Sequence, residues 1–228
     1  MARNDIEATQ ATCLSPEALQ SASAFTGQED GTVGMGSGQA KSETDTANFI
    51  NFCAGRQLTD GKQVANGSCN GIPMGRIPAS KKMISAIITK PGLGDKLFSN
   101  ATFEITIQTR NLHAGLQANP AATYYSAPQD LDADGYVMGH CHVVIEEIGD
   151  LRSNAAPDPA EFVFFRGIND AGDGRGLLRA PVPGGLPSGI YRACTMVAAR
   201  NHQPVVMPVA QRGAQNDCVR FVVAAGEI

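Results

Sequence analysis

Two histidines stand two residues apart in the stretch Gly139–Glu146, which reads GHCHVVIE, and the chain has only four histidines in all. Alternate side chains of a β-strand share a face. In a strand, His140, His142, Val144 and Glu146 would therefore point to one side. The residues that point to the other side, Cys141, Val143 and Ile145, would form the better core face. Two imidazoles on one face lie ~7 Å apart and can converge on one ion. The pattern predicts a metal or small-ligand site on this polar face.

His202, in a predicted loop before an apolar run, is the expected third ligand. Glu146 completes a His-x-His-x3-Glu string, which is similar to the first metal motif of cupins. The expected ligand set is His140, His142, His202 and Glu146, and it suits Zn, Cu, Fe, Mn or Ni. The cupin match is partial, because the flanking glycines are missing and Arg192 stands where a cupin would place a histidine. The competing interpretation is that the histidines only hydrogen-bond to neighbouring backbone. His113 is interpreted as an ordinary loop residue.

Other catalytic patterns are absent from the sequence, so catalytic residues remain unassigned. There is no Gly-x-Ser-x-Gly elbow, P-loop or dinucleotide fingerprint, so no nucleotide cofactor is expected. Cys141 falls on the predicted core face, which favours a buried thiol or half a disulfide over a nucleophile. Tyr124-Tyr125 and Phe164-Phe165 could offer a stacking surface for a glycan, although aromatic residues make up only 6% of the chain and most are needed in the core.

Composition narrows the possible partners. The net charge of −4 gives no electrostatic footprint for nucleic acid. The longest apolar runs have the length of strands, far short of the ~20 residues of a membrane helix, so no membrane insertion is expected. A small ligand or a cell-wall component remains as a possible partner.

Six cysteines and two sequons, at Asn66 and Asn100, indicate a secreted, extracellular, disulfide-bonded glycoprotein. The polar start at Met1 is unlike a signal peptide, and Met1 is interpreted as an initiator added to a mature form. A cytosolic protein with free thiols and chance sequons is the alternative. Cys53 and Cys69 bracket a polar segment, and a disulfide between them would close a loop worth roughly 3 kcal/mol. Their spacing matches no short zinc-binding pair.

The chain divides into an N-terminal arm and a β-rich domain. Residues 1–80 are expected to form an arm with a short helix, running from Ser15 to before Thr26, and with the Cys53–Cys69 loop, packed on a main domain of residues 81–228. In that domain, short β-type runs alternate with turns. The predicted strands are 83–89, 102–109, 136–148, 161–165, 177–182, 189–198, 205–210 and 218–224.

These runs predict an all-β fold, an antiparallel β-sandwich of the immunoglobulin-like type with an extended N-terminal arm. A jelly roll or a cupin-like barrel is the alternative. Tryptophan is absent, which excludes the Cys-Trp-Cys core of antibody domains.

Several motifs occur in an order that is similar to one protein family. They are NFINFCAG (48–55), GSCNGIPMGRIPA (67–79), GHCHVVIE, FVFFRGIND (162–170), GGLPSGIYRAC (184–194) and NHQPVVMPVAQRG (201–213). The family is a group of secreted fungal proteins that genomes often mislabel as a small-subunit ribosomal protein. The resemblance implies an extracellular fungal origin and no established reaction.

The resemblance also bears on the cysteines. It supports the pair Cys53 and Cys69, and it makes Cys194 and Cys218 look like an added pair, because family members usually carry apolar residues there. The pairing of Cys13 and Cys141 stays open, since the four cysteines beyond the first pair allow three connectivities.

The leading functional prediction is a secreted protein that binds a metal ion or small ligand at its histidine-lined face. The alternatives are a metal-dependent, cupin-like extracellular enzyme at the same residues, and a cell-wall-associated structural protein without a site. Three protein ligands plus an open position would permit catalysis, whereas a closed four-ligand site would argue for structure or storage.

Overall fold

The structure is a computed structural model that describes residues 14–26, 29–32, 43–62, 66, 69–120, 124–125 and 127–226. The chain falls into two compact units. The first comprises residues 1–58 with 66–71, and the second comprises residues 59–65 with 72–228. The sequence had placed this division at residue 80. Cys13 lies outside the described residues.

The first unit contains two short 3-10 helices, η1 (Pro16–Ala18) and η2 (Ser21–Ala24). The continuous helix predicted here is wrong, because Leu19 and Gln20 are extended. The Ser15 side chain makes no capping hydrogen bond, and short helices are marginal without an apolar face to bury. A disulfide joins Cys53 to Cys69 and closes the loop that the spacing predicted.

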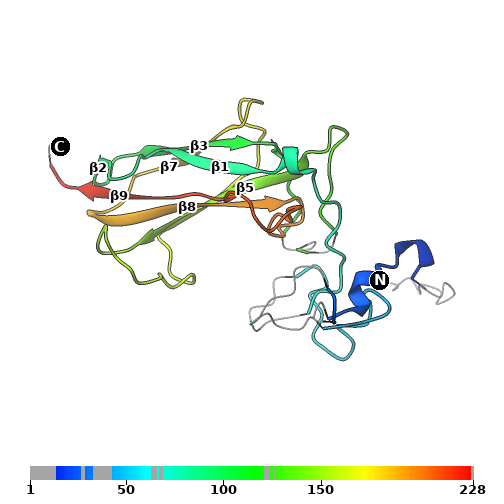
Figure 1. Cartoon of the computed structure of the whole chain (residues 1–228). Helices are drawn as coiled ribbons and strands as arrows, with labels where there is room; N and C mark the ends of the chain where they lie inside the picture. Colours follow the sequence, from blue (N-terminus) through cyan, green and yellow to red (C-terminus); the bar gives the residue numbers. More distant parts are fainter. Residues whose placement is uncertain are drawn as a thin grey trace, which may run out of the picture. The chain divides into compact units, whose positions relative to one another are not determined.

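The second unit begins with a further 3-10 turn, η3 (Ser80–Lys82), and its described residues form a β-sandwich (Figure 1). The strands are β1 (Ser85–Lys90), β2 (Lys96–Phe98), β3 (Phe103–Arg110), β4 (Leu112–His113), β5 (Val137–Glu147), β6 (Phe164–Ile168), β7 (Leu177–Val182), β8 (Gly189–Ala199) and β9 (Cys218–Ala224).

One sheet has the order β1-β3-β7, and the other has the order β2-β9-β8-β5-β4, with β6 also paired to β5. The long strands pair antiparallel, whereas β2–β9 and β4–β5 are parallel. The sheets correspond to the A-B-E and G-F-C arrangement of immunoglobulin-like sandwiches, with β6 in the place of C′. Both sheets are open. The immunoglobulin-like prediction is therefore confirmed, and the jelly-roll and cupin-barrel alternative does not hold.

Alternation along the strands builds the core between the sheets. Cys141, Val143 and Ile145 of β5 are fully buried there with Ile105 and Ile107 of β3. The prediction of the core face of β5 is thus correct. Burial raises the pKa of the Cys141 thiol to about 12. The thiol has no disulfide partner among the described residues, and this raised pKa makes it a poor nucleophile.

The prediction of a strand at 205–210 is wrong, although Val205 is buried. Pro204 and Pro208 lack the N–H groups that a central strand needs. The Gln129 side chain instead accepts from the N–H and donates to the carbonyl of Val206. The sequence did not predict the short strands β2 and β4, because two or three residues are too few to show the alternation of a strand.

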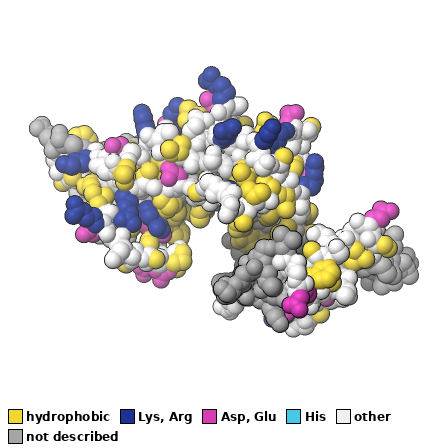
Figure 2. Space-filling model, viewed as in Figure 1, with side chains coloured by type: hydrophobic (Ala, Val, Ile, Leu, Met, Phe, Trp, Pro, Cys, Tyr) yellow, Lys and Arg dark blue, Asp and Glu magenta, His cyan; other side chains and the backbone are white. Residues whose placement is uncertain are grey.

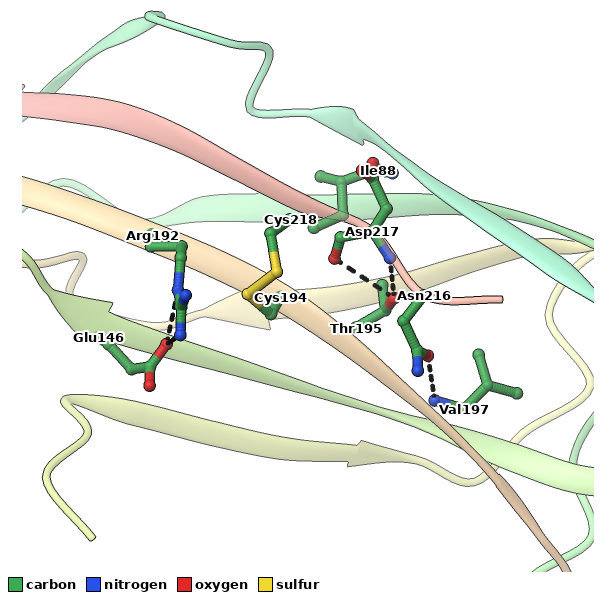
Figure 3. Close-up of a disulfide and its surroundings, with 9 residues drawn as sticks. All are labelled: Ile88, Glu146, Arg192, Cys194, Thr195, Val197, Asn216, Asp217 and Cys218. Carbon is green, nitrogen blue, oxygen red and sulfur yellow. Dashed lines mark hydrogen bonds and ion pairs between the residues drawn. A yellow bond between two sulfur atoms is a disulfide. The ribbon is translucent and has the colours of Figure 1, made fainter. Parts of the chain in front are cut away.

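On the outer face of the second sheet, a disulfide joins Cys194 of β8 to Cys218 of β9 at directly paired positions (Figure 3). Just before β9, Asp217 accepts a hydrogen bond from the Ile88 N–H of the other sheet. Asn216 accepts one from the Val197 N–H. This corner therefore holds the two sheets together by polar contacts as well as by the core.

Charged side chains are dispersed over the face shown in Figure 2, where Lys and Arg are interspersed with Asp and Glu and with hydrophobic groups.

Candidate metal centre

Strand β5 carries His140 and His142 on the face away from the sandwich core. In the register with β8 they oppose Ala198 and Met196. Gly139 lets the two strands approach at this point, since a Cβ there would lie 2.1 Å from the Ala198 carbonyl oxygen. The absence of a side chain at Gly139 thus allows the close pairing of β5 with β8 next to His140.

His202 comes from a three-residue turn that follows β8. The Ala199 N–H donates to the Gln203 carbonyl, and the His202 N–H donates to the Ala199 carbonyl, both at 2.9 Å. Such a loop places its third residue in the left-handed region, which normally selects glycine or asparagine. His202 occupies it with φ 73°. A β-turn position that is strained for histidine therefore presents the third imidazole.

A loop segment, Leu116–Ala118, covers the two strand ends. Its Leu116 N–H donates to the Gly139 carbonyl and its Ala118 N–H donates to the Arg200 carbonyl. His140 consequently has no exposed surface, although it lies on the outer face of the sheet. The histidine face lies opposite the core as predicted, and the loop covers His140 on that face.

The three imidazoles converge on one point. His140 Nε2 lies 3.1 Å from His142 Nε2 and 3.2 Å from His202 Nδ1, and all three atoms lie within 4.8 Å of one another. Zn–N bonds of about 2.0–2.1 Å in tetrahedral geometry separate two ligand nitrogens by about 3.3 Å. Two of the three separations are therefore close to those that a bound ion requires.

Hydrogen bonding fixes which nitrogen of His202 can bind metal. Its Nε2 lies 2.9 Å from the Ala118 carbonyl oxygen, which can only accept, so Nε2 carries the proton and Nδ1 presents a lone pair to His140. A backbone carbonyl in this role is the usual outer partner of a metal-binding histidine. His140 Nδ1 is buried without a hydrogen bond of good geometry. A hydrogen on His140 Nε2 can be donated to His142 Nε2 or to His202 Nδ1 but not to both. A metal ion, by contrast, accepts a lone pair from each of the three nitrogens.

Burial keeps the strand histidines neutral. It lowers the pKa of His140 to about 4, with further lowering by His142 and His202, and the Leu116 backbone opposes this in part. Burial likewise lowers the pKa of His142 to about 4, with His202 adding to the effect. Neutral imidazole is the form that binds metal. His140 and His142 are thus held in their ligand form well below neutral pH.

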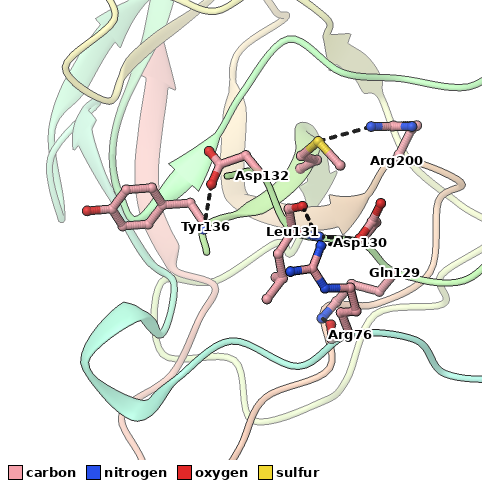
Figure 4. A network of polar contacts seen from close by, with 8 residues as sticks. Arg76, Gln129, Asp130, Leu131, Asp132, Tyr136 and Arg200 are labelled. Carbon is pink, nitrogen blue, oxygen red and sulfur yellow. Dashed lines mark hydrogen bonds and ion pairs between the residues drawn. The ribbon is translucent and has the colours of Figure 1, made fainter. Parts of the chain in front are cut away.

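A polar network fixes the segments on either side of the site (Figure 4). Arg76 pairs with Asp130 at 3.0 Å, ahead of β5, and Asp132 accepts the Tyr136 N–H at the start of that strand. The Gln129 side chain, 1% exposed, donates to the Arg76 carbonyl and binds the segment after the His202 turn. These contacts fix the segment that leads into β5 relative to the segment that follows the His202 turn.

Glu146 does not join the histidines, so that part of the expected ligand set is wrong. It shares their face but lies four residues beyond His142, about 13 Å along the strand at ~3.3 Å per residue. Its carboxylate is buried and accepts two hydrogen bonds from the Arg192 guanidinium, at 2.7 and 2.9 Å (Figure 3). Arg192 stands at the position that a cupin would give to a histidine, and it binds Glu146 instead. His113 also lies apart, paired with Asp132 at 2.8 Å.

A pocket of about 580 Å³ adjoins the cluster and is lined by His142 and His202 but not by the buried His140. Residues distant in sequence complete it, including Gln117, Tyr124, Phe165 and Asn169. The sequence had suggested only that the Tyr124-Tyr125 and Phe164-Phe165 pairs could offer stacking surface. No periodic pattern identifies Gln117 or Asn169, which come from loops. Chemically, the arrangement offers three neutral nitrogen ligands and one accessible side.

Fold and site together define an immunoglobulin-like β-sandwich with a three-histidine cluster at one end of its outer face. The chain matches the CLU5d N-terminal domain family over residues 86–224, and it belongs to that family. It is 52% identical over 212 residues to "Pathogenicity cluster 5 protein d" of Colletotrichum graminicola (strain M1.001 / M2 / FGSC 10212). The match covers 92% of this chain and 43% of that protein, so the chain spans less than half of its relative.

The comparisons therefore show a family with a fungal member and an uncertain function. Among solved structures, one described as "Structures of Clostridium thermocellum CbhA fibronectin(III)-like modules" is similar over 62% of this chain and 47% of that chain, with a TM-score of 0.33 and 10% identity. None of the described helices is long and apolar enough to cross a membrane.

Proposed function

We propose that this protein is an extracellular binding protein that holds a divalent transition metal ion through His140 Nε2, His142 Nε2 and His202 Nδ1. The observation that carries the proposal is the convergence of these three nitrogens, with separations of 3.1 and 3.2 Å about His140. In neutral form, each can offer a lone pair to the same ion. Secretion is part of the proposal. Two disulfides and the sequons at Asn66 and Asn100 support it.

The donor set favours some metals over others. Three imidazoles without a carboxylate suit Zn²⁺, Cu²⁺ and Ni²⁺, whereas the iron oxygenase triad uses two histidines and one carboxylate. Glu146 could have been that carboxylate, but it is paired with Arg192. We therefore expect Cu²⁺ and Zn²⁺ to bind more tightly than Mn²⁺ or Fe²⁺.

A metal-dependent hydrolytic enzyme is the second candidate. The observation in its favour is that three protein ligands converge in the described part of the chain and a pocket adjoins two of them. Catalytic zinc sites have this composition, in which three protein ligands leave a fourth position for water or substrate. Hydrolysis of a panel of chromogenic esters and phosphoesters by the zinc-loaded protein would favour this candidate.

Calorimetric titration and thermal melting of untagged protein with Zn²⁺, Cu²⁺, Ni²⁺, Mn²⁺ and Fe²⁺ test the metal proposal. A metal at a hundredfold excess over its dissociation constant should stabilise the fold by about 2.7 kcal/mol. His142→Ala should abolish this gain. His113→Ala, which alters the one histidine outside the cluster, should retain it. The proposal is refuted if no metal shifts the wild-type melt, or if His142→Ala binds as tightly as wild type.

A further inference from the structure

The cluster provides no negative charge to balance a bound dication. Its three ligands are neutral imidazoles, and the described residues that line the adjoining pocket include no Asp, Glu, Lys or Arg. A buried charge without a counter-charge is costly. A fourth ligand that is anionic would remove this cost, so the charge pattern favours an anionic donor over a neutral one.

Among the described residues, the open side of the cluster is the pocket, through which a fourth ligand would enter. His140 is fully buried under Leu116–Ala118, whereas His142 and His202 line the pocket wall. The pocket volume of about 580 Å³ lies within the range of about 300–1,000 Å³ typical of small-molecule sites.

Aromatic rings continue outward from both pocket histidines. The Phe165 ring lies 5.2 Å from that of His142 with an interplanar angle of 34°, and the Tyr124 ring lies 5.9 Å from that of His202 at 31°. His142 and His202 are themselves nearly parallel, at 7°. Phe165 is 48% exposed, so its ring has free surface beside the metal ligands. Rings at these separations favour a planar aromatic partner.

One polar group in the pocket lacks a partner. Gln117 Oε1 is buried and has no hydrogen bond among the described residues. Unpaired buried acceptors are rare in folded proteins. This unpaired oxygen lies in the wall of the pocket, out of contact with solvent.

We infer that the ligand of this centre is an aromatic compound with an anionic oxygen, either a phenolate or an aryl carboxylate. The oxygen binds the metal ion, and the ring packs against Phe165 and Tyr124. This inference rests on the proposed metal site.

The test compares benzoate with acetate, which lacks the ring, and with 4-nitrophenolate, which carries a ring but binds through a phenolate oxygen. Binding of Zn²⁺ is measured first, by calorimetry and by metal content after gel filtration, so that failure of the metal site is recognised separately. The zinc-loaded protein is then titrated with benzoate, 4-nitrophenolate and acetate. Stacking on one aromatic ring corresponds to about 2- to 13-fold in affinity. We expect benzoate to bind at least about tenfold more tightly than acetate.

Phe165→Ala should reduce the affinity for benzoate about three- to tenfold and leave the affinities for acetate and Zn²⁺ unchanged. Phe98→Ala is the matched control, because Phe98 is 52% exposed and lies on β2, outside the pocket. Tighter binding of 4-nitrophenolate than of benzoate would support a phenolate, and the reverse would support an aryl carboxylate. Benzoate that binds no better than acetate to protein with bound zinc would overturn the inference. Equal binding of benzoate to metal-free protein would also overturn it.

Discussion

The buried neutral histidines should make the metal-free protein sensitive to acid, and His140→Gln should remove part of that sensitivity. The pKa of His140 is lowered from 6.5 to about 4 in the folded protein, whereas the unfolded chain titrates near 6.5. The unfolded state therefore binds more protons between these values. The stability that His140 contributes is complete above about pH 6.5, is lost as pH falls towards 4, and changes little below that.

The magnitude follows from the two pKa values. Between pH 7 and pH 5, the linkage relation gives a loss of about 2 kcal/mol for one group with this shift. His140 has no exposed surface, so no correction for solvent screening applies. At a urea dependence of about 2 kcal/mol/M, the loss moves the unfolding midpoint by about 1 M.

The assay is urea unfolding of wild type and His140→Gln at pH 7, 6 and 5 with a chelator present. Glutamine keeps a polar side chain but does not titrate. Its overall effect on stability cancels, because only the change with pH is compared. We expect the wild type to lose about 2 kcal/mol more than the variant between pH 7 and pH 5. Equal losses in the two proteins would show that His140 is not held neutral by burial.

Three further predictions concern an ion pair, a disulfide and the backbone at His202. Arg192→Ala should destabilise the protein by about 2–3 kcal/mol in urea unfolding, because it leaves the buried Glu146 carboxylate without its guanidinium partner. The double variant Arg192→Ala with Glu146→Gln should recover much of that loss, and no recovery would contradict the pairing argument. Replacing Cys194 and Cys218 together by Ala should lower the free energy of unfolding by about 3 kcal/mol, since the disulfide closes a separation of 24 residues. Zinc titration of this variant should give wild-type affinity, and weaker binding would mean that the disulfide also orders the metal site. His202 has φ 73°, so metal-free His202→Gly should be about 1–2 kcal/mol more stable than metal-free His202→Ala, because only alanine retains the strain of the left-handed conformation. Equal melting temperatures of the two variants would show that the turn is not strained.

The strands were predictable because one face of each is core. Ile105 and Ile107 alternate with Glu104, Thr106 and Gln108 and are fully buried between the sheets, so a period of two appears in the sequence. The strand predicted at 205–210 does not form, because apolar residues alone do not make a strand when prolines remove the N–H groups that would pair with a neighbouring strand.

The three histidines of the candidate site were predictable from the sequence, His202 among them, but their surroundings were not. His140 and His142 share a strand, so spacing alone placed them together. The same spacing placed Glu146 on that face, but the sequence did not show that Arg192 on β8 would pair with it. The burial of His140 depends on Leu116–Ala118, a loop whose course no period encodes.

The histidine cluster departs from the ordinary rules of folding at several neighbouring points. His140 carries a buried nitrogen without a good hydrogen bond, Gln117 carries a buried oxygen without one, and His202 holds a backbone conformation that suits glycine. Each departure costs stability in the protein alone, of order 1–3 kcal/mol. Such costs persist where function requires them. The cluster therefore has the properties of a binding site, because a metal ion would engage the three converging nitrogens, His140 Nε2, His142 Nε2 and His202 Nδ1, and the His202 turn holds the third of them in place.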